Sequence, residues 1–172
     1  MDLILERRPS PVGEILLVSD ADGGLRALDF EGYEPRMLRL LGLHYGAVSL
    51  TPGGASPRVR DALDGYFAGD IAAIDGVPAT TVGTEFQRQV WAGLRTIGAG
   101  QTLSYGELAA RIGRTGASRA VGAANGANPV ALIVPCHRVI GANGGLTGFG
   151  GGLDRKQWLL DHERRHTGQR LI

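Results

Sequence analysis

Two helix-start motifs in the second half of the chain restrict its fold more than any other sequence feature. Thr84 stands three residues before Gln87, and Ser104 stands three residues before Glu107. At this spacing the hydroxyl accepts from the third helical residue, while the acid or amide accepts from the capping residue. Together with the apolar residues that follow, the motifs predict helices over residues 85–97 and 105–112.

A third helix is expected from Ser118, after the glycine-containing break at residues 113–116. A helix, a short turn with glycine and a second helix form the helix-turn-helix arrangement that is found in DNA-binding proteins. Two packed helices without any nucleic acid give the same pattern, so both interpretations stay open at this point. The third helix has an unusually small-sided surface, made by Ala120, Val121, Ala123 and Ala124.

The first half of the chain has the pattern of a small antiparallel sheet followed by helices. The expected strands are residues 3–5, 14–18 and 25–30. The expected helices are residues 34–43 and 57–68, and a polar loop follows up to residue 83. These elements place the chain in the α/β class and divide it near residue 82.

The two halves differ in charge, although the whole chain carries a net charge of only +1. Residues 1–83 have 12 acidic and 7 basic side chains, which gives −5, and residues 84–172 have 5 and 11, which gives +6. Of the 18 basic residues only Lys156 is a lysine. Guanidinium groups suit phosphates and base edges. A nucleic-acid partner and a biased genome composition both explain this excess of arginine.

Cys136 is the only cysteine, so the chain has neither an internal disulfide nor the cysteines of a structural zinc site. A reactive thiol needs a base that accepts its proton, and His137 is adjacent. Neighbours in an extended segment point to opposite sides, so this imidazole reaches the sulfur only through a turn or a water. A carboxylate that orients the imidazole would come from Asp161 or Glu163. A buried, inert thiol after the apolar residues 130–134 is the alternative.

No stretch of the sequence approaches the roughly 20 apolar residues that a membrane span needs. The first residues also lack the basic and apolar segments of a secretory signal. We therefore expect a cytoplasmic protein that does not associate with membranes.

The segment around Cys136 resembles the active-site signature of the methylated-DNA–protein-cysteine methyltransferases, proteins that repair O6-alkylguanine in DNA. It reads Pro135-Cys136-His137-Arg138-Val139. Further motifs of that family occur in the same order at residues 86–91, 104–109, 118–122, 128–129 and 151–160, with weaker ones at 10–13 and 24–28. So many motifs in one order argue against an inert thiol.

The resemblance implies two domains and a single-turnover reaction. Residues 1–82 would form a ribonuclease H-like α/β domain, and residues 83–172 a helical domain with a helix-turn-helix that binds DNA and transfers the alkyl group. The cysteine takes the alkyl group from O6 of guanine, and from O4 of alkylated thymine, and is never regenerated. The implied partner is double-stranded DNA bearing O6-alkylguanine, bound by a monomer without a cofactor or a metal.

The family's catalytic residues match four positions of this sequence. Cys136 matches the nucleophile. His137 matches the histidine that accepts the thiol proton through a water, and Glu163 rather than Asp161 matches the glutamate that holds this histidine. Asn128 matches the asparagine that links the DNA-binding helices to the active-site segment.

The family reaches its substrate by rotating the nucleotide out of the duplex from the minor groove, which costs a few kcal/mol. Tyr105 matches the tyrosine that helps this rotation, and Arg119 matches the arginine that replaces the nucleotide in the stack. A narrow groove admits only a helix with small side chains. The resemblance therefore implies a DNA-facing surface that includes Ala117, Ser118, Ala120 and Gly122.

The base pocket of the family is built mainly from backbone groups. The carbonyls of Cys136 and Val139 match acceptors for the exocyclic amine, and the amide of Gly150 matches a donor to O6. Animal members have Tyr-Ser where this chain has Phe149-Gly150. The exchange keeps an apolar wall and a backbone donor but removes a serine hydroxyl, which puts the range of substrates in doubt.

Three other functions compete with this interpretation. A sensor of alkylated DNA would lack the cysteine, which is present here. A helix-turn-helix repressor would carry long polar side chains on its recognition helix and would have no use for Cys136 and His137. A cysteine hydrolase would need an oxyanion hole, which a sequence does not reveal.

Overall fold

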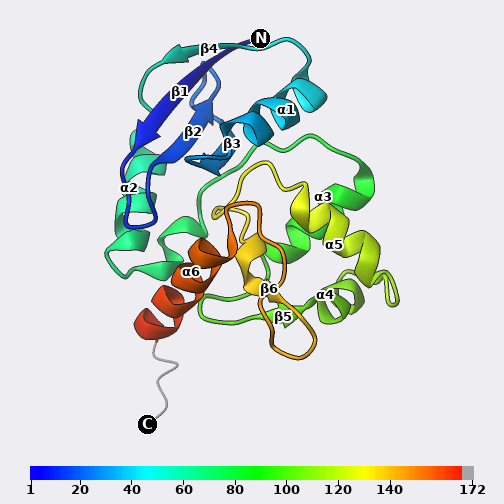
Figure 1. The fold of residues 1–172 in the computed structure, drawn as a ribbon. Coiled ribbons are helices and arrows are strands. Elements are labelled where there is room, and N and C mark those ends of the chain that lie inside the picture. Colours follow the sequence, from blue (N-terminus) through cyan, green and yellow to red (C-terminus); the bar gives the residue numbers. More distant parts are fainter. Residues whose placement is uncertain (168–172) are drawn as a thin grey trace. The chain divides into compact units, whose positions relative to one another are not determined.

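The computed structural model describes residues 1–167 as a mixed α/β fold with a four-stranded sheet, a two-stranded sheet and six α-helices (Figure 1). The chain divides into two compact units. The first consists of residues 1–82 with 129–133, and the second of residues 83–128 with 134 onward. Within residues 1–167 no helix has both the length and the apolar character needed to cross a membrane.

The sheet of the first unit has four strands in the order β3-β2-β1-β4. The strands are β1 (Asp2–Arg8), β2 (Ile15–Ser19), β3 (Leu25–Phe30) and β4 (Ser49–Pro52). The first three pair antiparallel as expected, but β4 lies parallel to β1. The prediction of a purely antiparallel sheet was therefore wrong. The helix after β3 crosses over, so β4 runs in the direction of β1.

Two α-helices belong to this sheet. They are α1 (Glu34–Tyr45) and α2 (Pro57–Phe67), followed by the 3-10 helix η1 (Ile71–Ile74) in the segment expected to be a polar loop. Met37 and Leu41 of α1 pack against Leu3, Leu16 and Val18 in the core. Proline at the first position and a serine cap start α2 as predicted.

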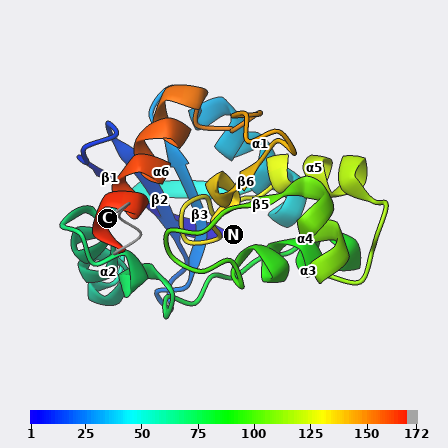
Figure 2. The same ribbon diagram turned by 90° about the horizontal axis from the view of Figure 1, so that it is seen from below.

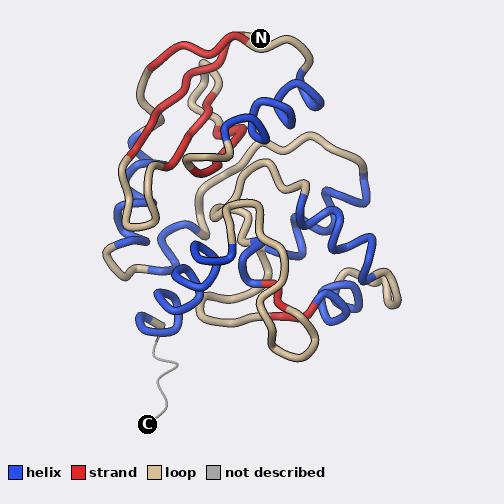
Figure 3. Tube along the Cα trace, in the orientation of Figure 1, coloured by secondary structure: helices blue, strands red, loops and turns tan. Residues whose placement is uncertain are grey.

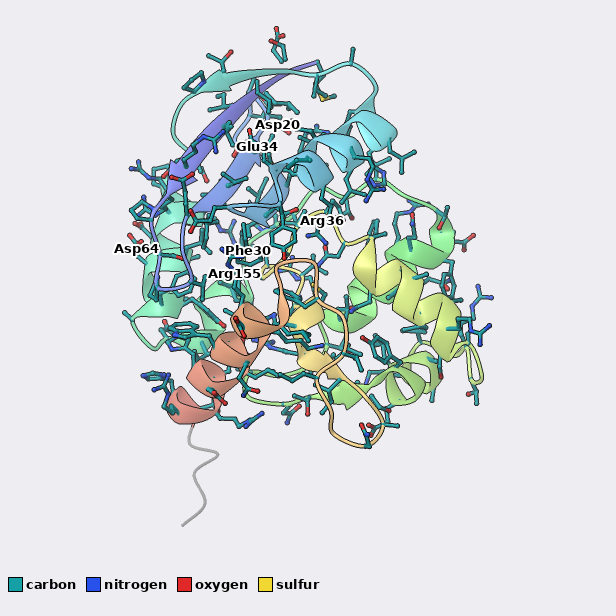
Figure 4. The ribbon with its side chains drawn as sticks, in the orientation of Figure 1. Asp20, Phe30, Glu34, Arg36, Asp64 and Arg155 are labelled. Atoms are coloured by element: carbon teal, nitrogen blue, oxygen red, sulfur yellow. The ribbon has the colours of Figure 1, made fainter. Side chains whose placement is uncertain are left out.

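Two ion pairs connect the C-terminal end of β1 to the helices. Arg7 lies 2.8 Å from Glu34 of α1, and Arg8 lies 2.7 Å from Asp64 of α2. Glu34 and Asp64 are labelled in Figure 4. Exposed pairs of this kind contribute little to stability, so they orient the helices rather than hold the core together.

Residues 129–133 are a short excursion of the chain into the first unit. The amide of Leu28 donates to the carbonyl of Pro129 at 3.1 Å, and the amide of Ala131 donates to the carbonyl of Leu28 at 3.2 Å. All five residues are buried, as the apolar pattern predicted. Leu132 has a φ of +70°, a conformation that a leucine adopts only under local constraint. The chain returns to the second unit just ahead of Cys136.

The second unit holds the predicted helices. Its elements are α3 (Glu85–Leu94), β5 (Leu103–Ser104), α4 (Tyr105–Arg111), α5 (Ser118–Gly126), η2 (Cys136–Arg138), β6 (Val139–Ile140) and α6 (Leu153–His166). Figures 1 and 2 show α6 on one side of the β5–β6 pair and the three helices α3, α4 and α5 on the other. The long loop between β6 and α6 is irregular (Figure 3).

Both helix-start motifs form complete capping boxes. The hydroxyl of Thr84 accepts from the amide of Gln87 at 3.1 Å, and the side chain of Gln87 accepts from the amide of Thr84 at 3.0 Å. Ser104 and Glu107 make the same pair of bonds. The starts of α3 and α4 therefore lie where the sequence predicted them. The end of α3 was predicted three residues too late, at 97 instead of Leu94.

The helices α3, α4 and α5 approach one another closely at glycine and alanine positions. A Cβ atom added to Gly93 of α3 would lie 2.5 Å from the Cγ2 of Ile112 and 3.1 Å from the Cδ1 of Leu108. The indole of Trp91 donates to the carbonyl of Ala124 at 2.9 Å. The small side chains thus serve the packing of this unit from within.

The substitution Gly93→Ala tests this packing. We expect it to lower the free energy of unfolding by about 1–3 kcal/mol, because the added methyl group overlaps the half-buried side chain of Ile112 and crowds the buried Leu108. The matched control is Gly42→Ala in α1, where an added Cβ has no atom within 4 Å. The control should raise stability by about 0.5–1 kcal/mol, because alanine favours the helix. Urea unfolding of both variants measures the difference, and a stabilised Gly93→Ala variant would contradict the close approach.

Candidate functional site

Cys136 lies on a turn and not on an extended strand. It opens the 3-10 helix η2, in which the amide of Arg138 donates to the carbonyl of Pro135 at 3.0 Å. The amide of Cys136 itself donates to the carbonyl of Val134 at 2.8 Å. The cysteine is 6% exposed. The sequence left a turn as one way to bring the thiol and the next residue together, and the chain does turn here.

The imidazole of His137 is completely buried and holds a carboxylate. Its Nε2 atom lies 2.6 Å from Oε2 of Glu163, which is also buried. Its other nitrogen, Nδ1, is buried and has no hydrogen-bond partner among residues 1–167. The ring of Phe149 meets the imidazole edge to face, with 6.5 Å between the centroids. One nitrogen of His137 is thus bound to Glu163, and the other has no partner among the described residues.

Arg138 is a member of this cluster that the sequence reading gave no role. It is 1% exposed, and its Nε donates to Oε1 of Glu163 at 2.8 Å. Its Nη2 lies 3.3 Å from the other carboxylate oxygen, and its Nη1 donates to the carbonyl of Ile97 at 2.8 Å. Its presence in the signature was the only sequence signal for this contact.

The carboxylate of Glu163 is held in its charged form. Burial alone would raise the pKa of Glu163, but the charges and hydrogen bonds of His137 and Arg138 outweigh burial and hold it far below its usual range. Glu163 therefore carries a permanent negative charge in the interior.

Asp161, the other carboxylate considered from the sequence, lies elsewhere on α6. It accepts from the side chain of Gln157 at 2.9 Å and lies 3.6 Å from Arg164, with its side chain 47% exposed. The structure therefore brings Glu163 to the imidazole and leaves Asp161 near the surface.

Two buried asparagines connect α5 to the segment around Cys136. Asn128 donates through Nδ2 to the carbonyl of Val134 at 2.8 Å. Asn125, which the sequence reading did not single out, points its Nδ2 at the carbonyl of Cys136 at a longer 3.4 Å. The end of α5 and the cysteine are thus joined through side chains as well as along the chain.

Lys156 fixes the far side of the cysteine segment, and the sequence reading also missed it. It is fully buried, and its ammonium donates to the carbonyls of Val139 at 2.6 Å and Thr147 at 2.7 Å. Burial lowers the pKa of Lys156, and the nearby Cys136, when ionised, opposes that shift. The only sequence signal was the place of Lys156 within the family motif at residues 151–160, which gave it no role.

The residues expected at the base pocket lie around this lysine. Val139 is buried on β6, next to η2. Phe149 and Gly150 are half-buried in the loop that leads to α6, where the amide of Gly152 donates to the carbonyl of Phe149 at 2.9 Å. The structure brings Phe149 to His137 but gives Gly150 no side-chain or backbone bond that identifies its role.

The residues expected to face DNA lie on α5 and at the start of α4. Ser118, Arg119 and Ala120 are exposed, and Ala117 and Gly122 are half-buried. The guanidinium of Arg119 makes no hydrogen bond or ion pair with any residue of the described range 1–167. The hydroxyl of Tyr105 lies 2.9 Å from the hydroxyl of Thr147. The outer surface of α5 is therefore small and polar.

Comparison with known proteins gives consistent matches. Residues 85–165 match the family model described as the DNA-binding domain of 6-O-methylguanine DNA methyltransferase. A methylated-DNA–protein-cysteine methyltransferase of Salmonella typhimurium is 52% identical over 167 residues, which cover 94% of this chain and 95% of that protein. A protein of the same name from Mycobacterium tuberculosis is 48% identical over 157 residues, which cover 90% of this chain and 88% of that one.

A solved structure has the same fold. The crystal structure of Mycobacterium tuberculosis OGT in complex with DNA superposes with a TM-score of 0.80 at 41% identity, covering 95% of this chain and 94% of that one. Identity at this level over nearly the whole length, together with the matched domain, identifies the fold and its chemistry. The chain belongs to the family of methylated-DNA–protein-cysteine methyltransferases.

Proposed function

We propose that this methyltransferase repairs O6-alkylguanine in double-stranded DNA by transferring the alkyl group irreversibly to Cys136. The observation that carries the proposal is the buried cluster beside the cysteine, in which Nε2 of His137 lies 2.6 Å from the ionised Glu163. Nδ1 of His137 is the nitrogen left to receive the thiol proton. The negative charge of Glu163 stabilises the imidazolium that this proton transfer produces.

The transfer is a single displacement. The thiolate of Cys136 attacks the alkyl carbon, a carbon–sulfur bond forms, and the bond between that carbon and O6 breaks. The electron pair of the broken bond stays on guanine, which takes up one proton. The thiol proton passes to His137 and from there to solvent, and guanine takes its proton from solvent, so one proton is released and one is taken up. The thioether product is stable, because a thiolate leaves an unactivated alkyl carbon only slowly, and each molecule therefore reacts once.

The DNA-binding part of the proposal rests on α4 and α5. The helix α4, the turn at residues 113–116 and α5 would form a helix-turn-helix whose second helix enters the minor groove. The small exposed side chains of α5 suit a narrow groove, with Arg119 available to replace the nucleotide that leaves the stack. In the first unit, the strand order β3-β2-β1-β4 with its parallel last strand supports the ribonuclease H-like assignment.

Several finer points remain predictions of the same proposal. They are the reaction with O4-alkylthymine, the monomeric state, the location in the cytoplasm, and the roles of Val139, Phe149 and Gly150 at the base. The assignment of DNA binding and alkyl transfer to residues 83–172, and not to residues 1–82, is also a prediction.

The nucleophile is tested by weighing the intact protein after incubation with a duplex that contains O6-methylguanine. We expect a gain of one methyl group, located at Cys136 and saturating at one equivalent. The variant Cys136→Ser should gain no mass while still binding the duplex, because a hydroxyl is a far weaker nucleophile near neutral pH. Methylation of the serine variant at a comparable rate would refute the assignment.

Rotation of the nucleotide is tested with Arg119→Ala. We expect repair of duplex O6-methylguanine to slow by about ten- to hundredfold, because the variant no longer fills the stack and unstacking costs a few kcal/mol. The reaction with free O6-benzylguanine should be unchanged, since a free base is not stacked. Arg39→Ala, which removes one positive charge from an exposed position of α1, is the control for general attraction to DNA. Equal losses on both substrates would place Arg119 outside the rotation step.

The charge of Glu163 is tested through the pH dependence of stability. A carboxylate whose pKa is lowered in the folded state stabilises the fold above its unfolded pKa, and this contribution disappears as the pH falls. Glu163→Gln should therefore lower the free energy of unfolding by about 3–5 kcal/mol near neutral pH, because it leaves Arg138 without its counter-charge. The difference from the wild type should shrink as the pH falls below about 4, where the unfolded-state carboxyl becomes protonated.

Urea unfolding at several pH values measures both curves. Asp161→Asn on the same helix is the matched control, because Asp161 lies near the surface, and it should change stability little at any pH. Parallel curves for the wild type and Glu163→Gln would show that the buried carboxylate is not charged in the folded protein.

A further inference from the structure

Thr147, in the glycine-rich loop between β6 and α6, makes one hydrogen bond through its backbone and one through its side chain. Its carbonyl accepts from the buried ammonium of Lys156 at 2.7 Å, and its hydroxyl lies 2.9 Å from the hydroxyl of Tyr105. The same ammonium donates to the carbonyl of Val139 at 2.6 Å. A chain of hydrogen bonds thus runs from the start of α4 through the loop to β6.

The backbone and the ring of Tyr105 are held by contacts other than the one with Thr147. It is the first residue of α4, and the capping box of Ser104 and Glu107 fixes the backbone there. Its ring lies against α5, because a Cβ added to Gly122 would lie 3.7 Å from the Cδ1 atom of Tyr105. The backbone and the ring are therefore held by α4 and α5. Only the hydroxyl depends on the loop.

The loop combines a glycine-rich backbone with several fixed points, among them the contact of Phe149 with His137. Between Gly141 and Gly152 it contains seven glycines, and glycine leaves the backbone more conformational freedom than any other residue. Lys156 is completely buried, and its ammonium holds the carbonyl of Thr147 through a part-buried bond. The hydroxyl of Thr147 is consequently presented to Tyr105 from a fixed backbone position, although Thr147 itself is exposed.

We propose that Thr147 is a positioning residue for the alkyl transfer, and that its hydroxyl holds the phenol of Tyr105 in the orientation that receives the rotated nucleotide. This inference rests on the proposed function, in which Tyr105 assists rotation. Threonine acts here through tyrosine and does not contact the reacting atoms. A pre-oriented phenol loses less conformational freedom when the nucleotide arrives, and the rotated state is reached more often.

The experiment is a double-mutant cycle of Thr147→Val and Tyr105→Phe, which removes each hydroxyl while keeping the shape of the side chain. Single-turnover rates are measured at saturating duplex O6-methylguanine and, separately, with free O6-benzylguanine. Thr147→Val should slow the duplex reaction by about three- to tenfold, the factor that one hydrogen bond contributes. It should leave the free-base reaction and the affinity for unmodified duplex unchanged, because neither involves a rotated nucleotide.

The cycle separates coupling from independent effects. In the Tyr105→Phe background, Thr147→Val should cost nothing further, because its partner hydroxyl is already absent. Thr51→Val, at an exposed threonine of β4, is the control for a threonine-to-valine exchange and should react as the wild type does. Additive losses in the double variant, or equal losses with the free base, would overturn the inference. A wild-type protein that fails to react with either substrate would overturn the proposed function instead.

Discussion

The buried carboxylate of Glu163 is the group on which the second unit depends. An uncompensated charge in the interior costs several kcal/mol, so Glu163 can be buried only together with His137 and Arg138. His137 and Arg138 belong to η2, and the carboxylate belongs to α6. Arg138 also donates to the carbonyl of Ile97, which follows the end of α3. The cluster forms only when all three segments meet. The charge that serves the chemistry is therefore also a condition of the fold.

The cysteine segment compensates for its lack of regular structure with side-chain donors. The turn η2 and the residues beside it have carbonyls that accept no hydrogen bond from a neighbouring strand. Buried carbonyls need a donor, so other groups must supply it. Three buried side chains supply the donors to Val134, Cys136 and Val139, namely Asn128, Asn125 and Lys156. Each donor comes from α5, from its C-terminal end or from α6. The position of the thiol is consequently set by helices and not by a sheet.

The sequence predicted those elements whose local chemistry is self-contained. The capping boxes located the starts of α3 and α4, because all their partners lie within four residues. The end of α3 was predicted too late, since Ile97 is buried but lies beyond the helix, in a turn in which the hydroxyl of Thr96 donates to the carbonyl of Gly93. The strand β4 was missed because Ser49–Pro52 is short, mostly exposed and paired only through a long-range contact.

The same limit explains the charged residues that the sequence reading left without a role. Arginine and lysine are normally exposed, and local patterns assign them to the surface. Arg138 and Lys156 are buried because partners from distant parts of the chain satisfy them. Only the resemblance to a family marked their neighbourhood as a site, and it gave neither residue a contact. The burial of these basic side chains near the nucleophile depends on tertiary contacts, which local sequence patterns do not show. Their positive charges are part of the electrostatics of the site, together with the charge of Glu163.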